Sequence, residues 1–213
     1  MDIEADVQEE LSWSPDVDET DIAIKVNEGV VTLTGFAKSY GEKYQAEQTV
    51  KRVAGVRGVA NDIQVRLPSG ASCTDPELAR SVVAAVRADL GAVSDHIKVL
   101  VHQANVTLEG EVEWHYLKER ASDAVRRCPG VVGLANLIEI KPKVVPQDIK
   151  HKIEEAFRRS AEVDAQQISV EAKDGEVTLR GRVRSLAERD EAQYTAWSAP
   201  GVKRVRNKIT IGL

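Results

Sequence analysis

Short stretches of alternating hydrophobic and polar residues recur three times along the chain, and each predicts a β-hairpin. In residues 168–181 (ISVEAKDGEVTLRG), apolar residues alternate with polar ones on both sides of the segment KDG. Alternation with period two places apolar side chains on one face of a strand, and a short break containing glycine is typical of a tight turn. Residues 22–35 and 97–110 follow the same pattern.

Each predicted hairpin is followed by a stretch with helical spacing and then by a third strand. After the first hairpin, Ala46, Val50 and Val53 recur at helical spacing, and a glycine shortly beyond marks a common helix end. The corresponding apolar residues of the other two stretches are Ala121, Val125 and Cys128, and Ala192, Ala196 and Ala199. Third strands are predicted over residues 59–65, 134–140 and 205–211.

An amphipathic helix is predicted before each hairpin, and the three helices differ in length. The clearest covers Asp75 to Leu90, with Asp75 as its capping residue and Pro76 in its first turn. A similar helix is predicted over Pro146 to Ser160, whereas the one over Ile3 to Leu11 is short. The order within each repeat is therefore helix, strand, strand, helix, strand.

The repeats keep a nearly constant spacing. Gly35, Gly110 and Gly181 are 75 and then 71 residues apart. Copies of this length are longer than solenoid repeats and close to the smallest self-sufficient domains. Proline, glycine and serine concentrate in the segments LPSGAS and KPKVVP, which separate the copies. The sequence predicts three modules, over residues 1–68, 74–143 and 144–213.

The predicted fold class is α+β, with three tandem αββαβ modules. A helix that links two strands of one sheet favours a parallel pair with a right-handed crossover. Each module is therefore expected to hold a three-stranded mixed sheet with two helices packed on one face. The other face is open to solvent or to a neighbour.

Two sets of repeated residues have structural interpretations. Glycines suited to turns and close packing occur at Gly29, Gly35, Gly55, Gly110, Gly130, Gly175, Gly181 and Gly201. The second hairpin turns at HQAN, so an Asn at positive φ, Asn105, is expected there. Asn61, Asn136 and Asn207 fall on the inward face of the third strands, where each amide is expected to form hydrogen bonds that tie a loop or a helix end.

The composition is that of a folded protein with small cores. Hydrophobic residues make up 42% of the chain but aromatic residues only 4%, so each core depends on Val, Ile, Leu and Ala. Cores this small are marginal, and contact between modules is expected to contribute to stability. Cys128 aligns with apolar residues and is interpreted as a small buried side chain, while Cys73 lies in a linker.

The beginning of the chain and its hydrophobic runs bear on location. No apolar run approaches the roughly 18 residues that span a bilayer. The first residues, MDIEADVQEEL, are acidic, whereas a secretory signal begins with basic residues. A cytoplasmic location is expected, or a periplasmic one if a signal has been removed.

The repeated motifs resemble the BON domain, named from a bacterial osmotically inducible protein and nodulation proteins. The resemblance rests on the hairpin motif G-x-V-T-L-x-G, the helix ending P-G-V-x-x-V-x-N and the αββαβ order, three times over. Ala104 replaces the turn glycine and Ala54 the proline of these motifs. The resemblance implies a bacterial envelope or stress-related binding module, associated with phospholipid or a membrane surface, and implies no chemistry.

Residues that could perform catalysis do not form a repeated set. His96, His102, His115 and His151 lie in different predicted elements without metal-binding spacing, so they are interpreted as surface residues. The aromatic residues follow no shared pattern, so nucleic acid is not an expected partner. We therefore predict no catalytic residues, no metal, no cofactor and no enzymatic activity.

Comparison of the copies reveals one contrast of charge on the open faces. The second strand and the residues after it present Thr32, Thr34, Phe36 and Lys38 in the first copy. The acidic counterparts in the second copy are Glu109, Glu111 and Glu113, and the third copy has Arg180, Arg182 and Arg184. Its third strand adds Arg204, Arg206 and Lys208. Six cations on one small face repel each other unless an anionic group lies opposite.

Three interpretations of this contrast remain open. The charges could simply keep the sheet soluble, the basic face could dock on the acidic face of the neighbouring module, or it could bind an external anionic surface. The leading functional hypothesis is a non-enzymatic tandem binding protein that associates peripherally with anionic phospholipid. The alternative is a protein interaction scaffold whose modules dock on each other or on a protein partner.

Overall fold

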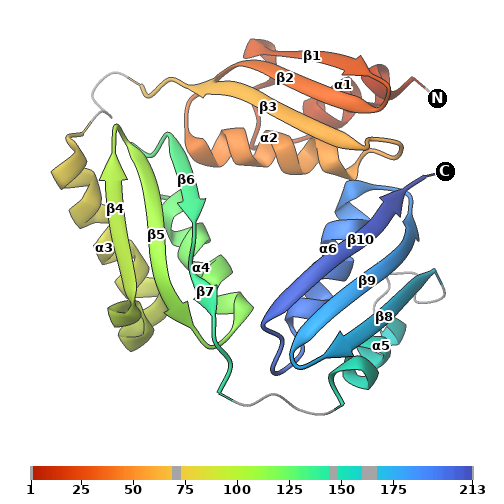
Figure 1. The fold of residues 1–213 in the computed structure, drawn as a ribbon. Helices are drawn as coiled ribbons and strands as arrows, with labels where there is room; N and C mark the ends of the chain where they lie inside the picture. Colours follow the sequence, from red (N-terminus) through yellow and green to blue (C-terminus); the bar gives the residue numbers. More distant parts are fainter. Residues whose placement is uncertain (1, 69–72, 144–147, 160–166, 213) are drawn as a thin grey trace.

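Three small modules lie at the corners of a triangle in the computed structural model (Figure 1). The structure describes residues 2–68, 73–143, 148–159 and 167–212. Most of the segments LPSGAS and KPKVVP, where the module boundaries are predicted, therefore lie outside the described residues. Modules 1, 2 and 3 below are the described parts of residues 1–68, 74–143 and 144–213.

Each module contains the predicted series of elements. Module 1 consists of α1 (Ile3–Ser12), the 3-10 turn η1 (Glu19–Asp21), β1 (Ile22–Asn27), β2 (Val30–Ala37), α2 (Tyr40–Arg52) and β3 (Gly58–Val65). Module 2 consists of α3 (Asp75–Leu90), η2 (Gly91–His96), β4 (Ile97–His102), β5 (Asn105–Val112), α4 (His115–Arg126), β6 (Gly133–Asn136) and β7 (Glu139–Ile140). Module 3 consists of α5 (Ile149–Arg159), β8 (Ile168–Lys173), β9 (Glu176–Val183), α6 (Leu186–Trp197) and β10 (Arg204–Ile211).

The sheets are mixed, which confirms the predicted fold class. In module 1, β1 pairs antiparallel with β2, and β2 pairs parallel with β3. Module 3 repeats this order with β8, β9 and β10. In module 2 the third strand forms two pieces, β6 and β7, which both pair with β5. The middle strand of each module therefore carries both neighbours, and the third strand is an edge.

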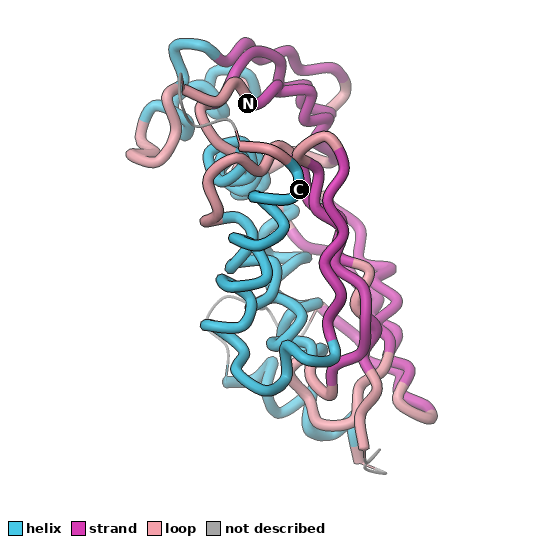
Figure 2. The backbone as a smooth tube through the Cα atoms, turned by 90° about the vertical axis from the view of Figure 1, so that its left-hand side faces the viewer, coloured by secondary structure: helices cyan, strands magenta, loops and turns pink. Residues whose placement is uncertain are grey.

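Helices cover one face of each sheet, and in all three modules this is the same side of the molecule. The strands lie together on one side of the tube view and the helices on the other (Figure 2). The three open sheet faces are therefore presented to one side. Side chains of the second and third strands that point away from the helices therefore face this side.

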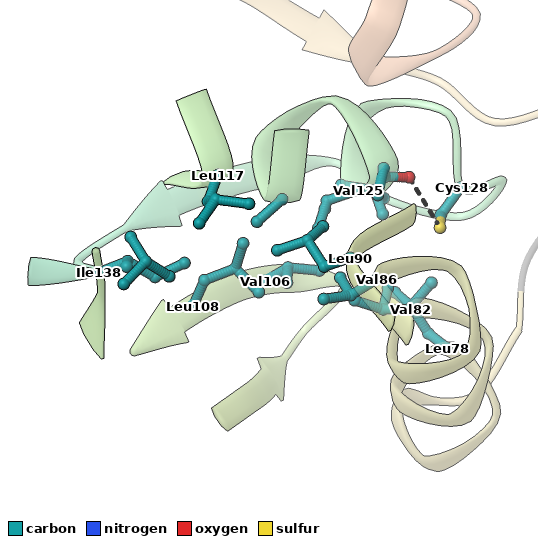
Figure 3. Close-up of a cluster of buried hydrophobic side chains, with 14 residues drawn as sticks. Leu78, Val82, Val86, Leu90, Val106, Leu108, Leu117, Val125, Cys128 and Ile138 are labelled. Atoms are coloured by element: carbon teal, nitrogen blue, oxygen red, sulfur yellow. Dashed lines mark hydrogen bonds between the residues drawn. The ribbon is translucent and has the colours of Figure 1, made fainter. Parts of the chain in front are cut away.

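The core of each module lies between its sheet and its two helices. In module 2, leucine and valine side chains of α3 meet those of β5 and α4 (Figure 3). Cys128 is buried there, as expected, and its thiol donates a hydrogen bond to the Ala124 carbonyl oxygen at 3.3 Å. Burial raises the pKa of this thiol, so it remains protonated and acts as an apolar side chain.

The β4–β5 turn corrects two predictions. Positive φ angles occur at Gln103 (49°) and Ala104 (59°) rather than at Asn105. The Asp75 carboxylate accepts hydrogen bonds from both turn amides, at 2.8 and 2.9 Å, so it stabilises a turn that glycine would otherwise form. Because Asp75 is used in this way, the capping residue of α3 is Thr74.

The three asparagines of the third strands occupy the same position in every module. Asn136 donates hydrogen bonds to the Lys118 carbonyl oxygen (2.8 Å) and to the Ser122 hydroxyl, and its oxygen accepts the Ile138 amide. Asn61 and Asn207 bond to α2 and α6 in the same manner. The amides thus hold the third strand against the second helix of each module.

The glycine at the end of the repeated hairpin motif allows close contact between backbones. Gly110 has φ of 137°, and a Cβ atom there would lie 2.0 Å from the His96 carbonyl oxygen. Gly35 and Gly181 have the corresponding environment, with 1.9 and 2.0 Å. The backbone that lies against each of these glycines is therefore that of the residue directly before the first strand of the module.

Candidate anion-binding face and the junctions between modules

The open sheet face of module 3 carries the cations that the alternation predicts. Arg180 on β9 lies opposite Lys208 on β10, and Arg206 lies opposite Thr178 in the parallel register. All six predicted cations are exposed; they are Arg180, Arg182, Arg184, Arg204, Arg206 and Lys208. With Lys173 on β8, this face holds seven Lys and Arg residues against Glu171 and Glu176, a net charge of +5. We call it the basic face.

Several arginines of the basic face form ion pairs within module 3. Arg180 lies 3.5 Å from Glu171, and Arg204 and Arg206 lie 3.7 and 2.8 Å from Glu176. Arg184 pairs with Glu188 of α6 at 2.7 Å. Lys208 forms no ion pair among the described residues. Apart from the half-buried Glu188, the paired side chains are exposed. Such pairs contribute little to stability, so they leave the charges able to exchange partners.

The acidic residues of module 2 also have partners within their own module. Glu111 pairs with Lys141, and Glu113 lies 3.2 Å from Lys143. Glu109 lies opposite Lys98 in the β4–β5 register. These pairs, like those of Arg180 and Arg184, form within single modules and not between modules 2 and 3.

The modules are instead joined through their second helices, at one repeated position. Tyr40, His115 and Leu186 are the aligned residues near the starts of α2, α4 and α6, and each contacts the next module. Tyr40 packs on the core of module 2, His115 stacks on Trp197 of module 3 with ring centroids 4.8 Å apart, and Leu186 is buried in the core of module 1. The contacts therefore run from module 1 to 2, from 2 to 3 and from 3 to 1, and the triangle closes.

A second aligned pair of positions lies about one and about three turns further along the same helices. The Arg126 guanidinium lies 3.8 Å from the centroid of the Tyr44 ring, which joins module 2 to module 1. Lys51 Nζ lies 3.5 Å from an Asp190 carboxylate oxygen, which joins module 1 to module 3. The Gly55 amide also donates a hydrogen bond to the Arg184 carbonyl oxygen at 3.2 Å. These contacts were missed by sequence reasoning because they involve residues outside the core periodicity.

His115 corrects the interpretation of the histidines as surface residues. His96, His102 and His151 are exposed, but the side chain of His115 is only 14% exposed. Burial and, to a smaller extent, the charge of Lys118 lower its pKa to about 4. Its Nδ1 atom is buried without a hydrogen-bond partner. The imidazole is therefore neutral near pH 7 and contributes to packing between modules 2 and 3.

The described part of the chain lacks two features that would indicate a metal centre or a membrane span. Within it, no group of three or more His, Cys, Asp or Glu residues is arranged to hold a metal ion. No helix in these ranges is long and apolar enough to cross a membrane. A groove of about 1170 Å³ lies between modules 2 and 3 beside the His115–Trp197 stack. Its mixed charges, among them Lys141, Glu171 and Arg204, do not form a set recognisable as catalytic.

The fold and the faces define a class of protein, a tandem array of αββαβ modules with open charged sheets. The BON domain family matches this chain three times, over residues 2–66, 74–142 and 147–212. The protein belongs to the BON domain family.

The chain is similar to a curated protein and to solved structures. It is 29% identical over 143 residues to Osmotically-inducible protein Y of Escherichia coli strain K12, covering 65% of this chain and 71% of that protein. The C-terminal domain of CdsD, a structural protein of the type III secretion system of Chlamydia trachomatis, has 12% identity and a TM-score of 0.27, over 100% of this chain and 98% of that one. A second CdsD structure has 13% identity and a TM-score of 0.26, over 100% and 93%. No inference follows from likeness at these TM-scores.

Proposed function

We propose that this protein is a non-enzymatic binding protein of a bacterial stress response, and that its basic face associates with an anionic phospholipid surface. The observation that carries the proposal is the net charge of +5 on one open sheet face of module 3. The relationship to an osmotically inducible protein supports the stress context. The cytoplasmic location expected from the sequence stays a prediction.

The chemistry of the basic face suits phosphate groups. Five of its seven cations are arginines, whose planar guanidinium groups can donate two parallel hydrogen bonds to a phosphate. Cations near an anionic membrane contribute about 1 kcal/mol each, and their effect falls off within a Debye length. The common orientation of the three sheets (Figure 2) would let a flat surface approach this side. Binding of this kind is peripheral and sensitive to salt.

The direct test is co-sedimentation with vesicles of phosphatidylcholine alone and of phosphatidylcholine mixed with phosphatidylglycerol. We expect the chain to sediment only with the anionic vesicles, and less as salt rises. The variant Arg180→Glu with Lys208→Glu, which reverses two cross-strand neighbours, should lose this binding. The matched control reverses Arg80 and Arg87, which are exposed on α3 on the helix-covered side. Its net charge changes by the same amount but the basic face is intact, so it should bind nearly as well.

The outcomes separate the lipid hypothesis from the scaffold hypothesis. Equal loss in both reversed variants would mean that net charge alone governs attraction, and would contradict a specific basic face. Absence of vesicle binding at low salt would reject the lipid hypothesis. The scaffold alternative would then require a protein partner whose binding is lost in the Arg180→Glu, Lys208→Glu variant.

Glu176 provides a test in the opposite direction. Its carboxylate lies between the guanidinium groups of Arg204 and Arg206, so it competes with an external anion. Replacement by Gln removes one negative charge from the face. We expect affinity for anionic vesicles to rise about fivefold, since one charge near such a surface is worth about 1 kcal/mol. Unchanged or weaker vesicle binding by this variant would show that Glu176 does not restrain the face.

A further inference from the structure

The second helices α2, α4 and α6 meet in a pseudo-threefold arrangement. One of its three equivalent junctions lacks the cation that the other two have. At the contact between modules 1 and 2, Arg126 lies against Tyr44, and at the contact between modules 3 and 1, Lys51 lies against Asp190. The aligned pair at the contact between modules 2 and 3 is Glu119 and Trp197. Two of the three equivalent positions hold a cation of the protein, whereas the third offers an indole ring and a carboxylate.

The three helices line a cavity at this place that is open to solvent. It has a volume of about 790 Å³ and is lined by residues of α2, α4 and α6. Tyr44, Tyr116, Tyr194 and Trp197 line it, which is four of the nine Phe, Trp and Tyr residues in the chain. Because the chain has so few aromatic residues, their concentration around one cavity indicates a site that contacts its ligand through aromatic rings.

Glu119 has no close cationic partner of its own. Its carboxylate oxygens lie 3.9 Å from Arg126 Nη2 and 3.7 Å from His115 Nε2, and the imidazole is neutral near pH 7. Arg126 is held more closely by Asp123 and lies over the Tyr44 ring. Burial raises the pKa of Glu119 more than the charge of Arg126 lowers it, which is the direction expected for a carboxylate whose negative charge is only partly compensated.

Aromatic rings and a carboxylate together recognise one class of ligand. The faces of Trp and Tyr rings attract cations, most strongly when water is partly excluded, and groups of such rings bind quaternary ammonium ions. We propose that the cavity between α2, α4 and α6 binds a small organic ammonium ion, with its charge near the Glu119 carboxylate and its methyl groups against Tyr194 and Trp197. The bound ammonium ion supplies, at the junction between modules 2 and 3, the positive charge that Lys51 and Arg126 supply at the other two junctions. The site is separate from the basic face.

The test is a titration of the full chain with tetramethylammonium chloride, followed by the indole N–H signal of Trp197 in two-dimensional NMR. Sodium chloride at the same ionic strength is the reference. We expect a saturable shift of this signal in the millimolar range with tetramethylammonium only. The signal of Trp13, which is 78% exposed in module 1, should remain unchanged.

Two variants test the role of the named groups. Glu119→Gln keeps the shape but removes the charge, and Tyr194→Leu removes one ring; each should weaken binding at least tenfold. Glu113→Gln is the matched control, since it removes a carboxylate of the same module that does not line the cavity, and it should bind as the wild type does. Amide spectra of each variant check that the fold is retained.

A third variant places a cationic side chain of the protein itself at the third aligned position. Trp197→Arg places a guanidinium where the other modules have Lys51 and Arg126, and it should abolish tetramethylammonium binding measured by calorimetry. The proposal is overturned if sodium produces the same shift, if no saturable shift occurs, or if Glu119→Gln binds as tightly as Glu113→Gln. It is also overturned if Trp197→Arg, shown to be folded, still binds.

Discussion

The junction between modules 3 and 1 and the junction between modules 2 and 3 use the same aligned residue with opposite chemistry. Leu186 is buried within the core of module 1, whereas His115 stacks on Trp197 and leaves Nδ1 without a partner. Burial of an apolar side chain stabilises the fold at any pH, while the contribution of a buried imidazole to stability changes when the ring is protonated. The difference indicates that one geometry of docking accepts both a permanent and a titratable contact.

The largest expected effect is at the apolar junction. Leu186→Ala should lower the free energy of unfolding by about 3 kcal/mol, because it removes a fully packed leucine and leaves a cavity. It should also speed hydrogen exchange at the Gly55 amide, which bonds to Arg184 across this junction. Leu117→Ala, in the core of module 2, is the control for stability alone. Unchanged exchange at Gly55 relative to that control would show that Leu186 does not hold the modules together.

The titratable junction should weaken in acid. The folded-state pKa of His115 is lowered from 6.5 to about 4, so the unfolded chain binds a proton more readily. Its contribution is complete above pH 6.5 and is lost as pH falls towards 4, by on the order of 3 kcal/mol. The ring faces Trp197 and Tyr194 of α6, and its charged neighbours are Lys118 and Glu119 of α4.

Denaturant unfolding between pH 7 and 4 measures this effect. His115→Phe keeps an aromatic ring but cannot titrate, so the difference between wild type and variant removes the contribution of the carboxylates that also titrate there. We expect the variant to gain stability relative to wild type as pH falls. Parallel curves for the two proteins would contradict the lowered pKa of His115.

The smallest expected effect is at the ion pair that accompanies Leu186. Lys51 lies 3.0 Å from Glu47 and 3.5 Å from Asp190, and the side chains of Lys51 and Asp190 are 20% and 39% exposed. Such a pair contributes up to about 1 kcal/mol, and less as salt rises. A double-mutant cycle with Lys51→Met and Asp190→Asn measures the coupling. A coupling well above the loss from Leu186→Ala would reverse the order of importance within this junction.

Local patterns predicted most of the fold. The hairpins, the second helices and the three-fold repetition follow from alternation, helical spacing and glycines within short segments, and α3 covers Asp75–Leu90 as predicted. The β4–β5 turn could not be predicted in the same way, because Ala104 at positive φ depends on a carboxylate distant in sequence, Asp75. Tertiary contact overrides the local preference for glycine at this turn.

The candidate sites were predictable only in part. Alternation was sufficient to place Arg180 and Lys208 on one open face, but the pairing of Glu176 with two arginines required the register between β9 and β10. The junction residues Tyr40, His115 and Leu186 had a signal in the alignment of the copies, since each is bulky and lies at the same position. That signal does not reveal which module each side chain contacts, because the contact depends on the angle between modules.

The closed triangle has a consequence for how many copies this architecture can hold. A contact that joins unlike surfaces of successive units either continues as a filament or returns to its starting point after a definite number of steps. Here it returns after three, because module 3 meets module 1 through Leu186 and through the hydrogen bond from the Gly55 amide to the Arg184 carbonyl oxygen. A fourth module inserted at a linker would require a new angle at every contact. Copy number is thus a geometric property of the docking position, and growth by further duplication would have to break the triangle first.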